Sequence, residues 1–275
     1  MTETIRQWSE DKLNILRDYA AAYSTILSKK TNLKHIYIDA FAGSGKYISE
    51  TTGKIVPGSP IKVLEVKPPF YEYHFVEKDP KKLNELKKLT EEYPKVHIYG
   101  GDCNEKLLKI IFPKVKYEDY KRALCFLDPY GIHLEWKVIQ QAGKMKSVEI
   151  FLNFAILDMR RNVLRRNLNK VNESQIVRMN KFWGDDSWRN LLSSSQLSLN
   201  LFKEKKYITL EYKNLAKEFQ SRLKKVAEFK FVPNPIPVRN PQRNILYYLF
   251  FASQNQVGYK IANDIFNKYN KKGIR

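Results

Sequence analysis

The stretch His35–Gly45, HIYIDAFAGSG, determines the expected fold. Its first half, His35–Asp39, is rich in aromatic and β-branched residues, which is typical of a short buried strand. Gly43 and Gly45 follow directly and break the chain into a turn. A glycine-rich turn at the end of a strand often binds an anionic or nucleotide-like ligand. The sequence therefore predicts a nucleotide-binding type of α/β protein.

Spacing separates three classes of nucleotide-binding turn. A P-loop requires G-x-x-x-x-G-K-[ST], but Tyr47 stands at the hydroxyl position and Ala40 at the first glycine position. A dinucleotide fingerprint requires a third glycine where this chain has Ile48. The pattern D-x-x-x-G-x-G, which is typical of S-adenosylmethionine-binding turns, is present as Asp39–Gly45. Its glycines would let the backbone approach the cofactor closely.

Strand-like and helix-like segments alternate through the first 154 residues, which favours a parallel, doubly wound sheet. Seven strands ending in an antiparallel hairpin predict a Rossmann-like class I methyltransferase fold. Helices are expected over residues 9–29 with Ser9 as N-cap, from Ser59 as N-cap, and over 79–93, 211–228 and 258–268. The expected strands are His35–Asp39, Tyr73–Glu77, Val96–Tyr99, Ala123–Leu127, Val148–Phe154, Phe229–Val232 and Ile245–Ala252.

Successive strands end in carboxylates: Asp39, Glu77, Asp102 and Asp128. The carboxyl ends of parallel strands form the ligand edge of an open α/β sheet. We expect Asp39 to meet the cofactor's ammonium group, directly or through water, Glu77 its ribose hydroxyls and Asp102 its adenine amine. The alternative is that each acid only caps a helix or lies in a solvated turn. Phe41 and Cys103, beside these acids, are added to the predicted cofactor site.

The segment Asp128-Pro129-Tyr130-Gly131 is the candidate catalytic motif. In amino methyltransferases a D/N/S-P-P-Y/F motif accepts hydrogen bonds from the target NH2 and stacks a ring on an extruded base. Here the second proline is missing and the ring comes one position early, which weakens the match for Tyr130. The alternative is an ordinary turn sequence. Tyr47 and Asn153 are predicted to line the substrate side of the pocket.

Composition bounds the remaining possibilities. The 275 residues, 43% of them hydrophobic, fit one elaborated domain, in which residues 155–210 form a helical basic insertion or lid. The net charge of +20 favours a polyanionic partner, DNA or RNA, over a protein or small-molecule substrate. Arg161, Arg165 and Arg166 are the predicted phosphate contacts. A solvated helix face, or docking of a partner protein, is the alternative.

Cys103 and Cys125 are isolated, without zinc-ligand spacing, so we expect reduced core thiols and no metal site. The polar start MTETIRQWSEDKL has no signal-like apolar run, and Ile245–Ala252 is too short to span a bilayer. The sequence thus predicts a cytoplasmic protein without a membrane partner.

The segments YIDAFAGSGKY, GSP, FVEKDPKKL, GDCNE, FLDPYG and ILYYLFFAS resemble the three-Cys-motif partner protein (TcmP) family over nearly the whole chain. More distantly, their order is similar to that of ribosomal RNA adenine N6-methyltransferases. The resemblance implies a methyltransferase-like fold, S-adenosylmethionine as cofactor and contacts at Asp39, Gly43, Gly45, Glu77 and Asp102. It leaves two functions open. One is N-methylation of a nucleic-acid base, adenine favoured. The other is a weakly active or inactive module that partners a three-Cys-motif, radical-SAM-like protein.

Overall fold

The computed structural model describes residues 3–164, 171–191 and 204–272. Its centre is a seven-stranded sheet in the order β6-β5-β2-β7-β8-β10-β9. Neighbouring strands from β6 to β8 are parallel, whereas β10 runs antiparallel to both β8 and β9. This arrangement confirms the predicted Rossmann-like methyltransferase sheet with its terminal antiparallel hairpin. The strands are β2 (Lys34–Asp39), β5 (Glu72–Glu77), β6 (Val96–Gly100), β7 (Lys121–Leu127), β8 (Val148–Phe154), β9 (Ile236–Arg239) and β10 (Ile245–Ala252).

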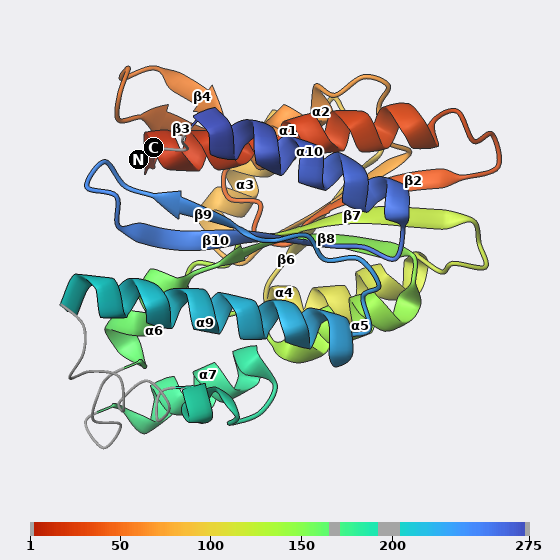
Figure 1. Ribbon diagram of the computed structural model, residues 1–275. Coiled ribbons are helices and arrows are strands. Elements are labelled where there is room, and N and C mark those ends of the chain that lie inside the picture. The colour runs from red at the N-terminus through yellow and green to blue at the C-terminus, as the bar shows by residue number, and fades with distance from the viewer. Residues whose placement is uncertain (1–2, 165–170, 192–203, 273–275) are drawn as a thin grey trace.

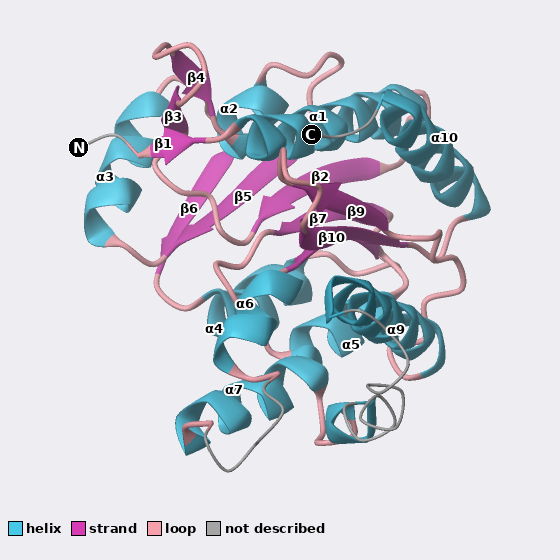
Figure 2. Ribbon diagram, turned by 60° about the vertical axis from the view of Figure 1, so that its left-hand side comes forward, coloured by secondary structure: helices cyan, strands magenta, loops and turns pink. Residues whose placement is uncertain are grey.

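Helices cover both faces of this sheet (Figures 1 and 2). One face carries α1 (Gln7–Leu27), α2 (Ser59–Leu64), α3 (Pro80–Leu89) and α10 (Gln256–Lys272). The other carries α4 (Cys103–Lys106), η1 (Leu107–Ile111), η2 (Phe112–Lys114), α5 (Trp136–Met145), α6 (Ile156–Asn162), α7 (Glu173–Trp183) and α9 (Glu204–Lys225). No helix in the described ranges is both long enough and apolar enough to cross a membrane.

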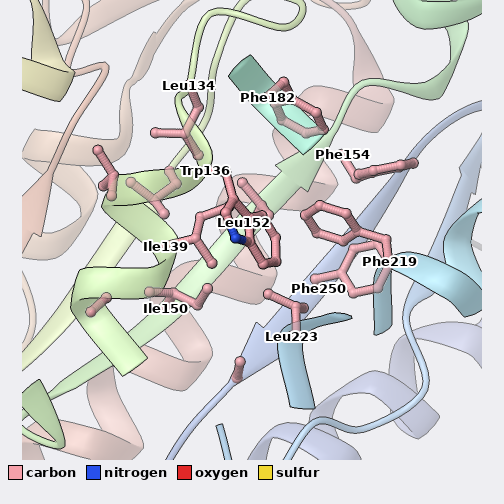
Figure 3. Packing of buried hydrophobic residues seen from close by; sticks show 14 of the residues in the cluster. Leu134, Trp136, Ile139, Ile150, Leu152, Phe154, Phe182, Phe219, Leu223 and Phe250 are labelled. Atoms are coloured by element: carbon pink, nitrogen blue, oxygen red, sulfur yellow. The ribbon is translucent and has the colours of Figure 1, made fainter. Parts of the chain in front are cut away.

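An aromatic cluster holds the second face together (Figure 3). The Phe219 ring of α9 lies 4.6 Å from that of Phe154 at the end of β8, and stacks on Phe182 of α7 at 5.7 Å. Each such pair adds about 0.5–1.5 kcal/mol to the burial of its rings. Phe219 therefore links the sheet to the segment that follows β8.

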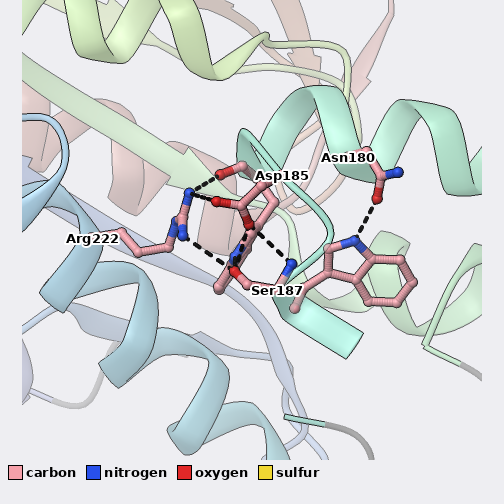
Figure 4. A network of polar contacts seen from close by, with 6 residues as sticks. Asn180, Asp185, Ser187 and Arg222 are labelled. Atoms are coloured by element: carbon pink, nitrogen blue, oxygen red, sulfur yellow. Dashed lines mark hydrogen bonds and ion pairs between the residues drawn. The ribbon is translucent and has the colours of Figure 1, made fainter. Parts of the chain in front are cut away.

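A partly buried polar network fixes α7 against α9 (Figure 4). Arg222 donates to the backbone oxygen of Trp183 at 2.8 Å and pairs with Asp185 at 2.9 Å. Trp188 donates through its indole nitrogen to Asn180 at 2.8 Å. Both tryptophans are fully buried and anchor this segment in the core. The thiols of Cys103 and Cys125 are free and buried, which confirms that both cysteines belong to the core.

The segment after the glycine turn forms a small second sheet rather than a simple loop. Strands β3 (Lys46–Ser49) and β4 (Ile55–Pro57) make a hairpin, and β1 (Thr4–Ile5) pairs in parallel with β3. Because β1 keeps the chain extended up to Ile5, α1 begins at Gln7 with Arg6 at its N-cap position. The prediction that Ser9 caps this helix was therefore wrong.

Three further predictions were wrong. Gly58, not Ser59, precedes α2, and the Ser59 hydroxyl bonds the carboxyl group of Asp39 instead. Residues 229–232 are not a strand, although Phe231 makes an isolated bridge to Ser253. The strand beside β10 is β9, whose Pro237 is tolerated because β9 lies at the edge of the sheet. Helix α3 also ends four residues early, at Leu89.

Glu149, near the start of β8, makes the stability of the protein depend on pH. Tyr19 donates to its carboxyl group at 2.5 Å and Ser253 at 2.8 Å, and burial raises its pKa to about 7. Between pH 4.5 and 7 the folded chain holds a proton that the unfolded chain has lost, so the free energy of unfolding falls as pH rises.

We expect Glu149→Gln to reduce the slope of unfolding free energy against pH by up to about 1.4 kcal/mol per pH unit, measured by urea unfolding. Glu118→Gln, at an exposed site, should leave the slope unchanged. An unchanged slope in Glu149→Gln would contradict the assignment.

Candidate active site

The glycine turn crosses the carboxyl ends of β5 and β7. The amide of Ala40 donates to Phe126 and that of Ala42 to Val76, each at 3.0 Å. Gly43 and Gly45 have φ values of +66° and +84°, in the left-handed region that favours glycine. Each must be glycine for a different steric reason.

The two glycines face different surroundings. A Cβ at Gly43 would lie 2.6 Å from the hydroxyl of Tyr47, whereas one at Gly45 would press on Leu86 and Leu89 of α3 at 3.1 and 3.3 Å. Gly43 lines the cleft beside β2, and Gly45 packs against α3.

Asp39 lies beneath the turn. Its carboxyl group is fully buried, and it accepts hydrogen bonds from the Phe41 amide at 3.1 Å, from Ser59 and from Tyr37. Burial is the largest influence on its pKa, which rises to about 7 despite these donors. Asp39 is missing from the described residues that line the two cavities beside the turn. Its contacts in the structure stabilise the conformation of the glycine turn.

Glu77, at the end of β5, is bound to the turn itself. One carboxylate oxygen accepts from the Gly43 amide at 2.8 Å, and the other accepts from the Asp79 amide at 2.7 Å. Asp102 is exposed, and its Oδ1 accepts from the Asn104 amide at 2.9 Å as the N-cap of α4. Asp102 thus has the capping role that the sequence left as an alternative.

A cavity of about 210 Å³ lies between these carboxylates. It brings together most of the residues predicted for the cofactor and adds His133. The lining residues include Ala40, Phe41, Glu77, Asp102, Cys103 and His133. Phe41 and Glu77 also line a second cleft of about 910 Å³, which contains Gly43, Tyr47, Asp128 and Asn153. The predicted cofactor and acceptor residues therefore share one continuous edge of the sheet.

Asp128 lines the larger cleft and is held by two side chains. Lys12 of α1 forms an ion pair with its Oδ2, and the Asn153 amide donates to Oδ1 at 2.7 Å. The side chain of Lys12 is only 9% exposed and that of Asp128 21%. Burial, followed by the nearby Asp128 charge, raises the pKa of Tyr47. Asp128 is thus a paired carboxylate rather than an isolated acceptor.

Sequence reasoning missed Lys12. The side chain lies on the apolar stripe of α1, in register with the buried Leu16, Ala20 and Tyr23. A lysine on the buried face of an amphipathic helix must find a counter-charge. The position of Lys12 on this buried face was the feature of the sequence that could have indicated a buried ion pair.

Asn153 carries an unsatisfied acceptor. Its Oδ1 is buried without a hydrogen-bond partner, although its amide nitrogen is used by Asp128. Buried polar atoms are normally satisfied, so an orphan oxygen in a cleft suggests a missing donor. Asn153 also lines a neighbouring groove of about 590 Å³, so it stands where the two spaces meet.

The Tyr130 side chain points away from the core and is 91% exposed. It lines the same groove, together with Arg161 of α6. Arg165 and Arg166, predicted with Arg161 to contact phosphates, lie outside the described residues.

No family model matches the chain, and no curated protein is found as a relative. Among solved structures, protein LPL1258 of Legionella pneumophila, of the DUF519 family model, superposes with a TM-score of 0.55 at 12% identity, over 94% of this chain and 91% of that one. The methyltransferase domain of METTL16 gives 0.41 at 10% identity over 85% and 65%. The putative methyltransferase YhhF of Escherichia coli gives 0.33 at 13% identity over 49% and 66%. At these identities the likeness concerns the fold alone.

Proposed function

We propose that this protein is an S-adenosylmethionine-dependent methyltransferase that N-methylates a base, adenine favoured, in nucleic acid. One observation carries the proposal. Gly43 of the glycine turn and Glu77 line the same cleft as the Asp128–Asn153 pair. A cofactor held by the first set and an amine held by the second would therefore be neighbours.

The residues present suit the cofactor. The cavity near Glu77 and Asp102 offers carboxylate acceptors for ribose hydroxyls and an adenine amine, with Phe41 and Cys103 as apolar walls. A side chain at Gly43 would fill the cleft against Tyr47. When bound there, S-adenosylmethionine supplies an electrophilic methyl group. The chain's own contribution is to position the two reactants and exclude water.

The acceptor amine fits the orphan oxygen of Asn153. An amine N–H donating to Oδ1 would satisfy this buried atom, and the remaining lone pairs of Asp128 could accept the second N–H. Two such bonds would turn the nitrogen lone pair toward the methyl donor. Lys12 holds the Asp128 carboxylate in place through their ion pair, so it acts as a positioning residue.

The Lys12–Asp128 pair also favours a second candidate function. Because Lys12 and Asn153 occupy both oxygens of Asp128, the fold could serve as a cofactor-binding or nucleic-acid-binding module that is weakly active alone. Its partner would then be a three-Cys-motif, radical-SAM-like protein, as the family resemblance implies.

Transfer of a labelled methyl group to purified DNA and RNA pools tests both functions. The purified protein is incubated with labelled S-adenosylmethionine, and the nucleosides are analysed by mass spectrometry. We expect label on the exocyclic nitrogen of adenine in one pool. Label only on protein, or no label despite demonstrated cofactor binding, would overturn the proposed activity and leave the binding module.

A further inference from the structure

We infer that a groove beside the active site binds the sugar–phosphate backbone next to an unpaired acceptor base. The inference rests on the proposed function, since it names the form of nucleic acid that this site would accept. The arginine groove, of about 590 Å³, is defined here by six of its lining residues: Arg6, Trp8, Tyr130, Arg160, Arg161 and Arg243.

The groove opens into the reaction centre. Pro129, Tyr130 and Asn153 line both the groove and the larger cleft that contains Asp128. A strand lying in the groove would therefore reach the orphan oxygen of Asn153 with an adjoining base. The groove is built from segments far apart in sequence, namely the start of α1, the end of β7, α6 and the β9–β10 turn.

The charge of the groove suits phosphates. Its lining includes four arginines, and Asp158 is the acid among the lining residues that are described. Within the described part of the chain, Arg160 and Arg243 are exposed and form no ion pair. Unpaired guanidinium groups that line one groove favour a polyanion, because they can bind phosphate oxygens bidentately.

The position of Arg243 is fixed by its turn. Its amide donates to Asn240 at 2.8 Å, its carbonyl oxygen accepts from Arg239 at 2.9 Å, and Asn240 also accepts from the Asn244 amide at 2.9 Å. Arg243 itself has a φ of +61°, which is unfavourable for a residue with a side chain. Such strain is often retained where it serves a site. Arg6 is also held in place, since it pairs with Glu50 at 2.9 Å and lies 5.2 Å from the centre of the Trp8 ring.

Tyr130 indicates that the base is unpaired. Its ring projects into solvent where the groove meets the cleft. Exposed rings beside a cationic groove bind single strands by stacking on bases, whereas a duplex keeps its bases stacked inside. The acceptor base therefore lies in a single-stranded segment of the nucleic acid.

Salt-dependent binding of a short fluorescein-labelled, adenine-containing single strand tests the inference. Anisotropy titrations between about 50 and 200 mM salt compare the wild type with Arg160→Gln/Arg243→Gln. Two lost phosphate contacts should flatten the log–log slope by about 1.4, at roughly 0.7 per contact for single strands. Lys144→Gln/Lys230→Gln removes the same charge from exposed sites outside the groove and should leave the slope unchanged. The wild type should also bind the single strand more tightly than its blunt duplex.

An unchanged slope in the groove variant, or an equal loss in the matched lysine variant, would overturn the groove as the contact site. Preference for the duplex would overturn the unpaired base. These readouts need no methyl transfer, so they are separate from the fate of the proposed function. A flattened slope in a protein that transfers no methyl group would support the groove and refute the activity.

Discussion

Gly43→Val combined with Gly45→Val is expected to abolish binding of S-adenosylmethionine, for which the wild type should show micromolar affinity in calorimetry. Both glycines have positive φ values, where a β-branched residue is strongly disfavoured. The new side chain at residue 43 would also meet the Tyr47 hydroxyl, since even a Cβ lies 2.6 Å from it. The turn would have to move, and the Gly43 amide would lose Glu77.

A matched pair of alanine variants separates the steric effect from backbone strain. Gly53, in the β3–β4 turn, has a φ of +67°, close to that of Gly43, but a Cβ there would meet nothing within 4 Å. Gly43→Ala should weaken cofactor binding strongly, while Gly53→Ala should cost only the strain of its own turn. Equal affinity in the wild type and the valine double variant would mean that the cofactor binds elsewhere.

The sequence predicted the parts of the fold that depend on local pattern. The bounds of β8 and β10 match the expected strands because both are buried apolar runs between polar turns. Glu77 and Asp128 stand at strand ends as predicted, since the alternation of elements fixes which end of each strand faces the ligand edge.

What the sequence did not reveal depends on tertiary contacts. Lys12 meets Asp128 across 116 positions, and no spacing rule connects them. Strand β9 was not predicted because it contains Pro237, which is acceptable only in a strand at the edge of a sheet. Which strand lies at the edge is known only once the strand order is known. Arg243 carries no motif in the sequence, and the β9–β10 turn brings it into the same groove as Arg160 and Arg161 of α6.

Replacing Asp128 should reduce methyl transfer much more than cofactor binding. Asp128→Ala removes both carboxylate oxygens, and we expect methyl transfer to fall by about 100- to 1,000-fold, as when a single preorganised polar group is lost. Cofactor affinity should stay within a few-fold, because Asp128 belongs to the acceptor side of the cleft. Turnover with saturating cofactor and a calorimetric titration measure the two quantities.

Asp128→Ala alone would be ambiguous, because it leaves the buried Lys12 without a partner. Breaking such a pair costs about 3–5 kcal/mol of folding free energy. The double variant Lys12→Met/Asp128→Ala removes both charges and should recover most of that stability in urea unfolding. If Asp128 helps to hold the acceptor amine, the double variant should still be inactive although its stability has recovered. Asn153 alone cannot accept both N–H groups of the amine. Recovery of methyl transfer together with stability would instead show that Asp128 serves only to neutralise Lys12.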